Sequence, residues 1–140
     1  MAVSLTRTVR FHALHRLYRS DWTEAQNREF FGSVSEPPGH PHDYHCAVTV
    51  QGPIDHSHGM VVDLALLDRI LHDEVVAPFD GKHLNLDEPA FAEGRMLPTC
   101  EAIAAIVFAR IAAQLPSGIV LERVRISEDP TLYGDCTGIP

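Results

Sequence analysis

The stretch from Gly39 to Gly52, GHPHDYHCAVTVQG, decides the fold because it combines a strand pattern with a histidine pair. Polar and apolar residues alternate from His42 to Val50, and a period of two is typical of a strand with one buried face. A Gly-, Pro- and Ser-rich loop over Gly32–Pro41 precedes this strand. His40 and His42 are two residues apart, so in an extended chain both imidazoles point to the same side.

Three further strands and three helices are predicted around this stretch. Alternation predicts strands, and caps and apolar spacing predict helices; the strands are Val3–Phe11, Ile119–Ile126 and Thr131–Cys136, and the helices are Thr23–Phe31, Leu64–Val76 and Cys100–Leu115. The predicted N-caps are Ser20-Asp21, Asp63 and Thr99. Residues 78–98 are predicted to be mostly irregular. This order predicts one α+β domain over residues 1–140, with helices on one face of an antiparallel sheet.

The composition narrows the function classes. The chain has 140 residues, a formal charge of −8 and no cluster of Lys or Arg, so nucleic acid is disfavoured as a partner. No apolar run approaches the roughly 20 residues of a membrane span, and residues 1–10 lack the apolar stretch of a signal peptide. The three cysteines are irregularly spaced, which indicates free thiols in a reducing compartment. A cytoplasmic protein is expected.

Three of the nine histidines are candidate metal ligands. His15 follows the first predicted strand, so pairing of the first two strands brings it near His40 and His42. Three neutral imidazoles with a fourth position left open are the ligand set of a catalytic zinc. On spacing alone the alternative is three unrelated surface histidines, because His-x-His is a weak signal.

Six segments resemble, in order, motifs of the 6-pyruvoyl-tetrahydropterin synthase and 6-carboxytetrahydropterin synthase family. They are Phe11–Leu17 (Phe-x-Ala-x-His-x-Leu in the family), Asn27–Gly32 (Asn-x-x-x-Phe-Gly), Gly39–Tyr44 (Gly-His-Gly-His-Asn-Tyr), His58–Leu64 (Thr-Gly-Met-Val-x-Asp-Leu), Asp80–Asn85 (Asp-His-Lys-x-Leu-Asn) and Pro98–Glu101 (Pro-Thr-x-Glu). The resemblance runs from about Val9 to Glu128. Six ordered motifs are far more specific than any one of them.

This resemblance implies a tunnelling fold (T-fold), in which a four-stranded antiparallel sheet is backed by two long helices. Three subunits close a barrel and two rings commonly stack, so a homotrimer or homohexamer with sites between subunits is expected. The implied activity is that of a lyase acting on 7,8-dihydroneopterin triphosphate or a related dihydropterin. The implied cofactor is Zn²⁺, bound by His15, His40 and His42.

Two glutamates are implied to hold the pterin. The family's Pro-Thr-x-Glu glutamate grips the donor edge of the pterin ring and corresponds to Glu101, although an acid in the first turn of a helix also suits the helix dipole. Glu128 resembles a second acid near the pterin pocket in some members. Its alternative role is that of a solvated turn residue before Asp129-Pro130.

The loop before the zinc histidines departs from the family pattern. The family uses a cysteine there for proton transfer, but residues 33–39 contain none, and Val34 or Glu36 takes its place according to the loop length. In one branch of the family a glutamate replaces this cysteine, and a carboxylate beside zinc can act as a base. Cys46 lies further along the strand and is better explained as a buried structural thiol.

The family's Asp-His pair is also altered. Asp80 is retained, but Gly81 replaces the adjacent histidine, and His83 is the candidate substitute. The alternative for His83 is a residue of the surface or core. The catalytic candidates are therefore Asp80, Glu36 and His83.

Three functions remain open at this point. The first is a lyase of the tetrahydropterin synthase type. The second is a dihydroneopterin-cleaving lyase with Glu36 as the base. The third is a zinc-containing pterin-binding protein without catalysis, which the missing cysteine and histidine would favour.

Overall fold

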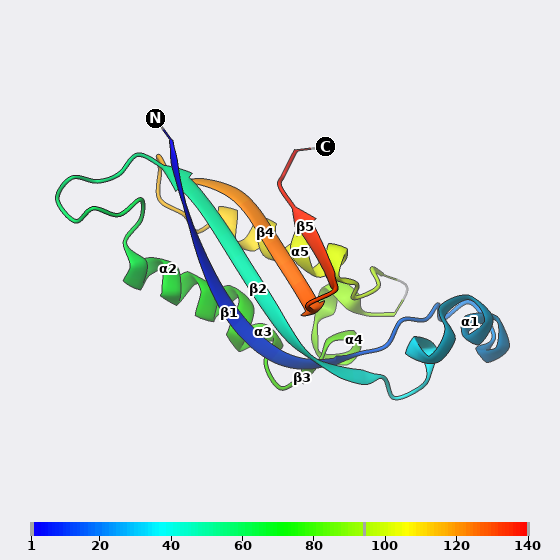
Figure 1. Ribbon diagram of the computed structural model, residues 1–140. Helices are drawn as coiled ribbons and strands as arrows, with labels where there is room; N and C mark the ends of the chain where they lie inside the picture. Colours follow the sequence, from blue (N-terminus) through cyan, green and yellow to red (C-terminus); the bar gives the residue numbers. More distant parts are fainter. Residues whose placement is uncertain (1, 94, 140) are drawn as a thin grey trace.

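The fold is seen in a computed structural model that describes residues 2–93 and 95–139 (Figure 1). The strands are β1 (Val3–His15), β2 (His40–Gly52), β3 (Lys82–His83), β4 (Val120–Asp129) and β5 (Leu132–Cys136). The helices are α1 (Glu24–Phe31), α2 (Leu64–Leu71), α3 (Ala77–Phe79), α4 (Leu84–Asp87) and α5 (Cys100–Ala112), with 3-10 turns η1 (Gly32–Ser35) and η3 (Pro89–Phe91) and a π-helical turn η2 (His72–Val76). The predicted α+β class is confirmed.

The sheet has the strand order β3-β1-β2-β4-β5. β1, β2, β4 and β5 pair in antiparallel fashion, as predicted, and β3 adds two residues parallel to β1. The sheet therefore has five strands rather than four. β1 and β2 pair without interruption from Val3 opposite Gly52 to His15 opposite His40, so both strands extend further than alternation alone predicts.

The helices cover one face of this sheet (Figure 1). On the strand side, alternate residues of β2 from Tyr44 to Val50 are fully buried. On the helix side, the buried residues are Leu67, Ile70 and Leu71 from α2, Val75 from η2, and Ile103, Ala104, Val107 and Ile111 from α5. Full burial of a large apolar side chain contributes roughly 1.5–3 kcal/mol. The two predicted long helices are confirmed, since α2, η2 and α3 follow one another without a gap and α5 is a single helix.

Helix α1 projects away from the sheet on a long connection (Figure 1). The predicted N-cap at Ser20-Asp21 is wrong. Thr23 caps the helix, because its side chain accepts a hydrogen bond from the Gln26 N–H while the Gln26 side chain accepts one from the Thr23 N–H. Asp21 pairs with Arg19 instead, at 2.8 Å.

The segment from Pro78 to Pro98 is more ordered than the sequence predicts. It contains β3, α4 and η3, each of two to four residues. Elements this short do not complete a hydrophobic period, so a pattern search does not detect them.

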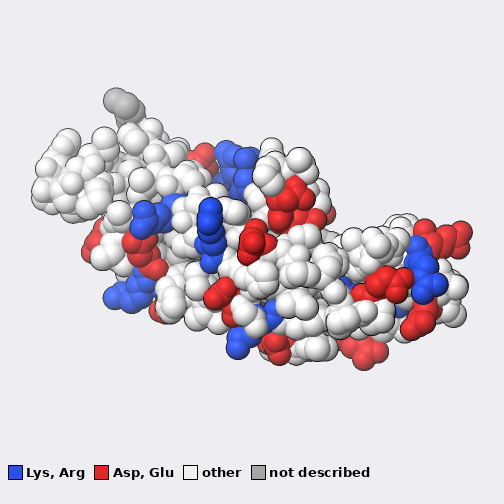
Figure 2. Space-filling model, turned by 60° about the horizontal axis from the view of Figure 1, so that its bottom comes forward, with Lys and Arg blue, Asp and Glu red and all other residues white. Residues whose placement is uncertain are grey.

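The surface agrees with the composition. Over the face shown in Figure 2, the Lys and Arg side chains lie among Asp and Glu side chains and do not gather into one basic area. Within the described residues, no helix is long and apolar enough to cross a membrane.

Candidate metal centre

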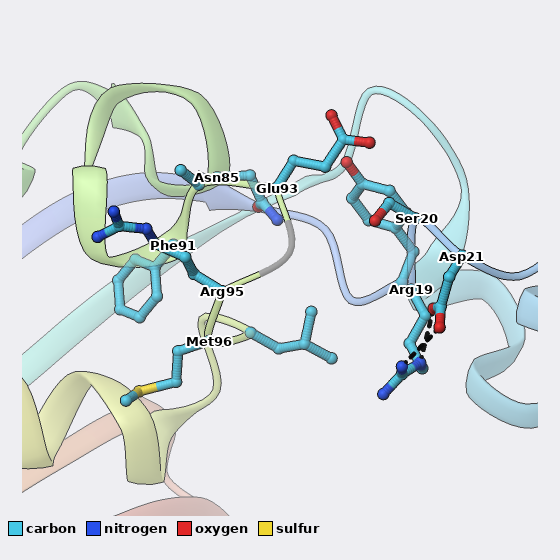
Figure 3. Close-up of a pocket in the computed structure, with 11 residues that line it drawn as sticks. Arg19, Ser20, Asp21, Asn85, Phe91, Glu93, Arg95 and Met96 are labelled. Carbon is cyan, nitrogen blue, oxygen red and sulfur yellow. Dashed lines mark hydrogen bonds and ion pairs between the residues drawn. The ribbon is translucent and has the colours of Figure 1, made fainter.

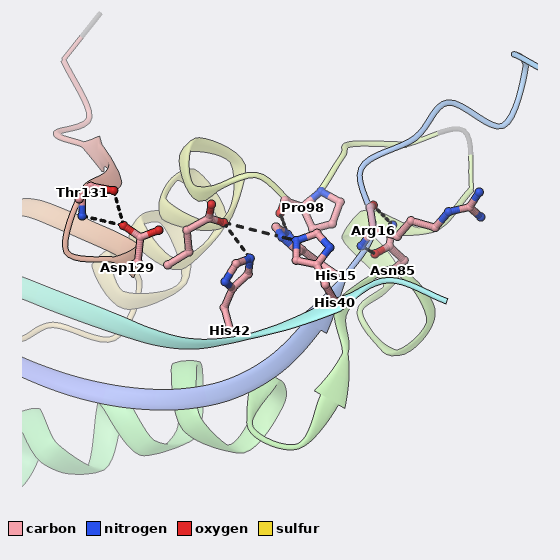
Figure 4. A network of polar contacts seen from close by, with 9 residues as sticks. His15, Arg16, His40, His42, Asn85, Pro98, Asp129 and Thr131 are labelled. Carbon is pink, nitrogen blue, oxygen red and sulfur yellow. Dashed lines mark hydrogen bonds and ion pairs between the residues drawn. The ribbon is translucent and has the colours of Figure 1, made fainter. Parts of the chain in front are cut away.

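The three candidate ligands meet at one end of the sheet, on the face that the helices cover (Figure 4). His15 is the last residue of β1 and lies directly opposite His40, the first residue of β2. His42 is two residues further along β2, so its side chain leaves the strand on the same face as that of His40. One nitrogen of each imidazole lies within 4.8 Å of the others. The predicted convergence of His15, His40 and His42 is therefore present in the structure.

A backbone carbonyl fixes the tautomer of His15. Its Nδ1–H donates to the carbonyl oxygen of Pro98 at 2.8 Å, just before the Thr99 cap of α5. In the neutral ring the other nitrogen, Nε2, then carries a lone pair, and it lies 2.9 Å from Nε2 of His40. Such an outer hydrogen bond is the usual support of a metal-bound histidine.

Burial favours the neutral form of His15 and of His40. His15 is 1% exposed, and burial lowers its pKa to about 4, although the hydrogen bond to Pro98 opposes this shift. The neighbouring His40 and His42 lower the pKa of His15 further. Burial also lowers the pKa of His40. Neutral imidazoles are the form that binds metal ions.

The donor set fits zinc. His42 Nε2 is buried and has no hydrogen-bond partner among the residues described. An unsatisfied buried nitrogen costs roughly 1–3 kcal/mol, and coordination to a cation would satisfy it. Three imidazole nitrogens suit zinc and leave a fourth position for a substrate oxygen.

Glu128 adds a carboxylate to the centre. Its Oε2 lies 3.5 Å from His42 Nε2 and 3.7 Å from His15 Nε2, and its side chain is only 15% exposed (Figure 4). Burial raises its pKa, His42 acts in the opposite direction, and the charges of Asp129 and Glu101 raise the pKa further. Glu101 lies in the first turn of α5 and is exposed. Of the two predicted pterin ligands, Glu128 is therefore the one closer to the histidines.

Of the predicted Asp80 and His83, only His83 lies near the metal centre. Its Nε2–H donates to the Pro38 carbonyl at 2.6 Å, and its Nδ1 is buried with no partner among the described residues. It is close enough to lower the pKa of His15. Asp80 instead accepts a hydrogen bond from the His12 N–H at 2.9 Å, which holds the edge of β1. No bond joins Asp80 to His83 in this part of the chain.

Glu36 and Cys46 are not brought to the histidines. Glu36 forms an exposed ion pair with Arg28 at 2.8 Å, in the loop that leads to β2. Cys46 is fully buried in β2, and burial raises the pKa of its thiol to about 12. A thiol of this kind is not reactive, as expected for a structural cysteine.

Two contributors to the centre carried little signal in the sequence. Tyr44 packs its ring edge-on against His15 and His42, at centroid distances of 5.9 and 5.5 Å. Its position two residues after His42 indicates the shared face. Pro98 contributes only its backbone carbonyl, which no side-chain pattern reports.

A hollow of about 300 Å³ is lined by residues other than the three histidines (Figure 3). It is bounded by the connection from β1 to α1 and by the segment that follows α4; among its lining residues are Tyr18, Arg19, Asn85, Phe91 and Met96. It includes none of the three histidines. The donor chemistry, rather than this hollow, therefore marks the candidate site.

Comparison with known proteins agrees with this geometry. The chain matches the 6-pyruvoyl tetrahydropterin synthase family over residues 4–138. It is 37% identical over 124 residues to 6-pyruvoyl tetrahydrobiopterin synthase of Pongo abelii, covering 89% of this chain and 83% of that protein.

The chain belongs to the 6-pyruvoyl tetrahydropterin synthase family, a family of lyases. The solved structure of 6-pyruvoyl tetrahydropterin synthase from Caenorhabditis elegans has a TM-score of 0.89 and 30% identity, covering 99% of this chain and 97% of that one. A Plasmodium vivax 6-pyruvoyltetrahydropterin synthase, described as a catalytic residue mutant with a glutamate changed to alanine, shares the fold at 12% identity. Its TM-score is 0.68, and 97% of each chain is covered. The predicted tunnelling fold is thereby confirmed.

The low pKa of His15 predicts a pH dependence of stability in the metal-free protein. Its folded pKa of about 4 lies below the ordinary value of 6.5, so the unfolded chain binds the extra proton first as pH falls. This contribution to stability is complete above pH 6.5 and is lost as the pH falls toward 4. From pH 7 to pH 5 we expect a loss of about 2 kcal/mol in the free energy of unfolding, measured with urea.

The control is a His15→Gln variant, which cannot take up that proton. Its loss of stability over the same pH range should be smaller than that of the parent. Equal losses in the two proteins would show that His15 is not the cause.

Proposed function

We propose that this protein is a zinc-dependent lyase of the 6-pyruvoyl tetrahydropterin synthase type, acting on 7,8-dihydroneopterin triphosphate or a related dihydropterin. The observation that supports it most is the convergence of three imidazoles, with one nitrogen of each within 4.8 Å of the others, in a member of this family. When bound there, zinc supplies Lewis acidity toward the side-chain oxygens of the substrate, which acidifies the neighbouring C–H bond.

The two glutamates are proposed to hold the pterin. A carboxylate accepts hydrogen bonds from the ring N–H and amino groups, and two parallel bonds fix the ring orientation. Glu128 lies beside the histidines. A pterin ring bound to Glu128 would therefore place the substituent of the ring next to the proposed metal ligands. Glu101 raises the pKa of Glu128 and is proposed to contact the same ligand from the start of α5.

His83 is proposed to move the proton. Because its Nε2–H donates to Pro38, its Nδ1 carries the lone pair and can accept a proton from the substrate. That nitrogen is buried, and His83 is close enough to His15 to lower its pKa. Asp80 supports it indirectly, because its bond to the His12 N–H anchors the segment that carries β3.

The second candidate is carbon–carbon cleavage of dihydroneopterin with Glu36 as the base. The description of the Plasmodium vivax protein names a glutamate as a catalytic residue, and Glu36 is the one acid between Gly32 and His40. For this role Glu36 has to leave its ion pair with Arg28. Such exposed pairs contribute only about 0–1 kcal/mol, so this step is not prohibitive.

Product analysis separates the candidates. The zinc-loaded protein is incubated with dihydroneopterin and with its triphosphate, and the products are identified by mass spectrometry. We expect elimination of triphosphate. Glycolaldehyde would favour the Glu36 reaction, and saturable binding without turnover would favour a binding protein.

Removing the carboxylate of Glu128 is expected to weaken pterin binding more than the same change at Glu101. Glu128→Gln loses a charge-assisted bond in a partly buried site, so we expect the Kd to rise about 10- to 100-fold. Glu101→Gln, at an exposed position, should raise it less. Fluorescence titration with neopterin measures both, and the reverse order would assign the principal contact to Glu101.

A homotrimer or homohexamer is proposed as the working state. β3 pairs only with Ala13 and Leu14, so the outer edge of β1 before them has no neighbouring strand among the described residues. β5 is the opposite edge and exposes half of Leu132 and Tyr133. If the β1 edge of one copy pairs with the β5 edge of another, neither edge is left with unpaired backbone groups. Light scattering should give three or six times the chain mass of 15.5 kDa.

A further inference from the structure

The hydroxyl of Tyr44 is an unused donor inside the candidate site. Tyr44 is 0% exposed, its ring stacks on Phe11 at 4.8 Å, and its hydroxyl has no hydrogen-bond partner among the described residues. Leaving such a group unpaired costs roughly 1–3 kcal/mol, whereas phenylalanine would fill the same space without that cost. An unpaired buried hydroxyl beside a metal centre therefore calls for a functional explanation.

An unused acceptor stands next to it. β2 and β4 pair with His45 opposite Ser127, so one step further along Tyr44 lies across from Glu128 on the helix-facing side. The Glu128 carboxylate forms no hydrogen bond within the described residues; the Nε2 atoms of His42 and His15 lie 3.5 and 3.7 Å from it.

A phenol carries one O–H, so the chemistry available to the Tyr44 hydroxyl is to donate one hydrogen bond to a nearby acceptor.

Metal ligation changes the choice of partners for Glu128. An imidazole nitrogen whose lone pair is given to a cation carries no hydrogen, so it cannot donate to a carboxylate. Once the Nε2 atoms of His15 and His42 serve as ligands, the Tyr44 hydroxyl and the Cys100 thiol are the donors that remain beside Glu128, and the thiol is the weaker of the two.

We propose that Tyr44 is a positioning residue, whose hydroxyl donates to the Glu128 carboxylate and fixes its orientation toward the pterin ring. A carboxylate has about four lone-pair sites, so one bond from Tyr44 leaves the two that face a bidentate ligand. This inference rests on the proposed function for its ligand, but the Tyr44–Glu128 bond itself does not depend on any pterin.

The bond is tested without substrate by a double-mutant cycle. Tyr44→Phe, Glu128→Ala and the double variant are compared by thermal unfolding of the zinc-loaded protein. We expect the sum of the two single decreases in Tm to exceed the decrease in the double variant by about 3 °C, because each single substitution removes the same bond. Additive shifts would overturn the proposal. Zinc content should be unchanged in Tyr44→Phe.

The consequence for the ligand is tested by fluorescence titration with neopterin. Tyr44→Phe should raise the Kd about tenfold in the parent and have no effect in Glu128→Ala. Tyr18→Phe, which removes a hydroxyl from the connection between β1 and α1, is the matched control and should bind like the parent. Parental affinity in Tyr44→Phe would overturn the positioning role. If the Tm values show coupling but the parent does not bind neopterin, the Tyr44–Glu128 bond stands and the proposed function is rejected.

Discussion

Replacing His42 by alanine is expected to abolish stoichiometric zinc binding. The change leaves two imidazoles, one fewer than the three protein ligands that hold a catalytic zinc. Loss of even an outer supporting group costs 10- to 100-fold in metal affinity, so loss of a ligand should cost more than about 100-fold. Elemental analysis after gel filtration should give about one zinc per parent chain and almost none in the variant.

The matched control is His45→Ala. His45 is three residues further along β2, and its side chain leaves the opposite face of the strand. Its zinc content should equal that of the parent. If His42→Ala also keeps the parental zinc content, the three-histidine centre is wrong.

Gly39→Ala is expected to destabilise the protein severely. Gly39 has φ +117°, a conformation that alanine rarely adopts, and its added Cβ would lie 2.6 Å from the backbone oxygen of His15. Neither the strand nor the loop can yield without moving His15 or His40. We expect a loss of about 3–5 kcal/mol in the free energy of unfolding, measured by urea denaturation.

Gly59→Ala is the control for backbone strain alone. Gly59 also has a positive φ, +76°, but an added Cβ would meet no atom within 4 Å. Its loss should be about 1 kcal/mol. Equal losses in the two variants would mean that the contact with His15 is not what requires glycine at position 39.

The convergence of the three histidines is predictable from the sequence because one local rule and one strand pairing determine it. Alternation places His40 and His42 on one face, and antiparallel pairing of neighbouring strands brings the end of the first to the start of the second. The full register, with His15 directly opposite His40, requires the complete pairing and is visible only in the structure.

The surroundings of the three histidines are harder to predict from the sequence, because they depend on tertiary contacts. Motif matching assigns Asp80 to chemistry, yet its carboxylate binds a backbone N–H of β1. In the sequence, Glu128 follows the predicted strand Ile119–Ile126 and resembles a solvated turn residue. In the structure it lies within β4, which pairs with β2. The Pro98 carbonyl reaches His15 from 83 positions away in the chain, which no local pattern can report.

Local errors have equally physical causes. Ser20-Asp21 is a sound cap sequence, but Thr23 with Gln26 satisfies two backbone N–H groups reciprocally and is therefore preferred. β3 was missed because two residues contain no complete alternation.

The most direct test of the metal centre is an anomalous difference map at the zinc edge from crystals of the zinc-loaded protein. We predict one strong peak per chain, at about 2.0–2.1 Å from one nitrogen each of His15, His40 and His42. A peak held by other residues, or no peak at the three histidines at full zinc occupancy, would contradict the account.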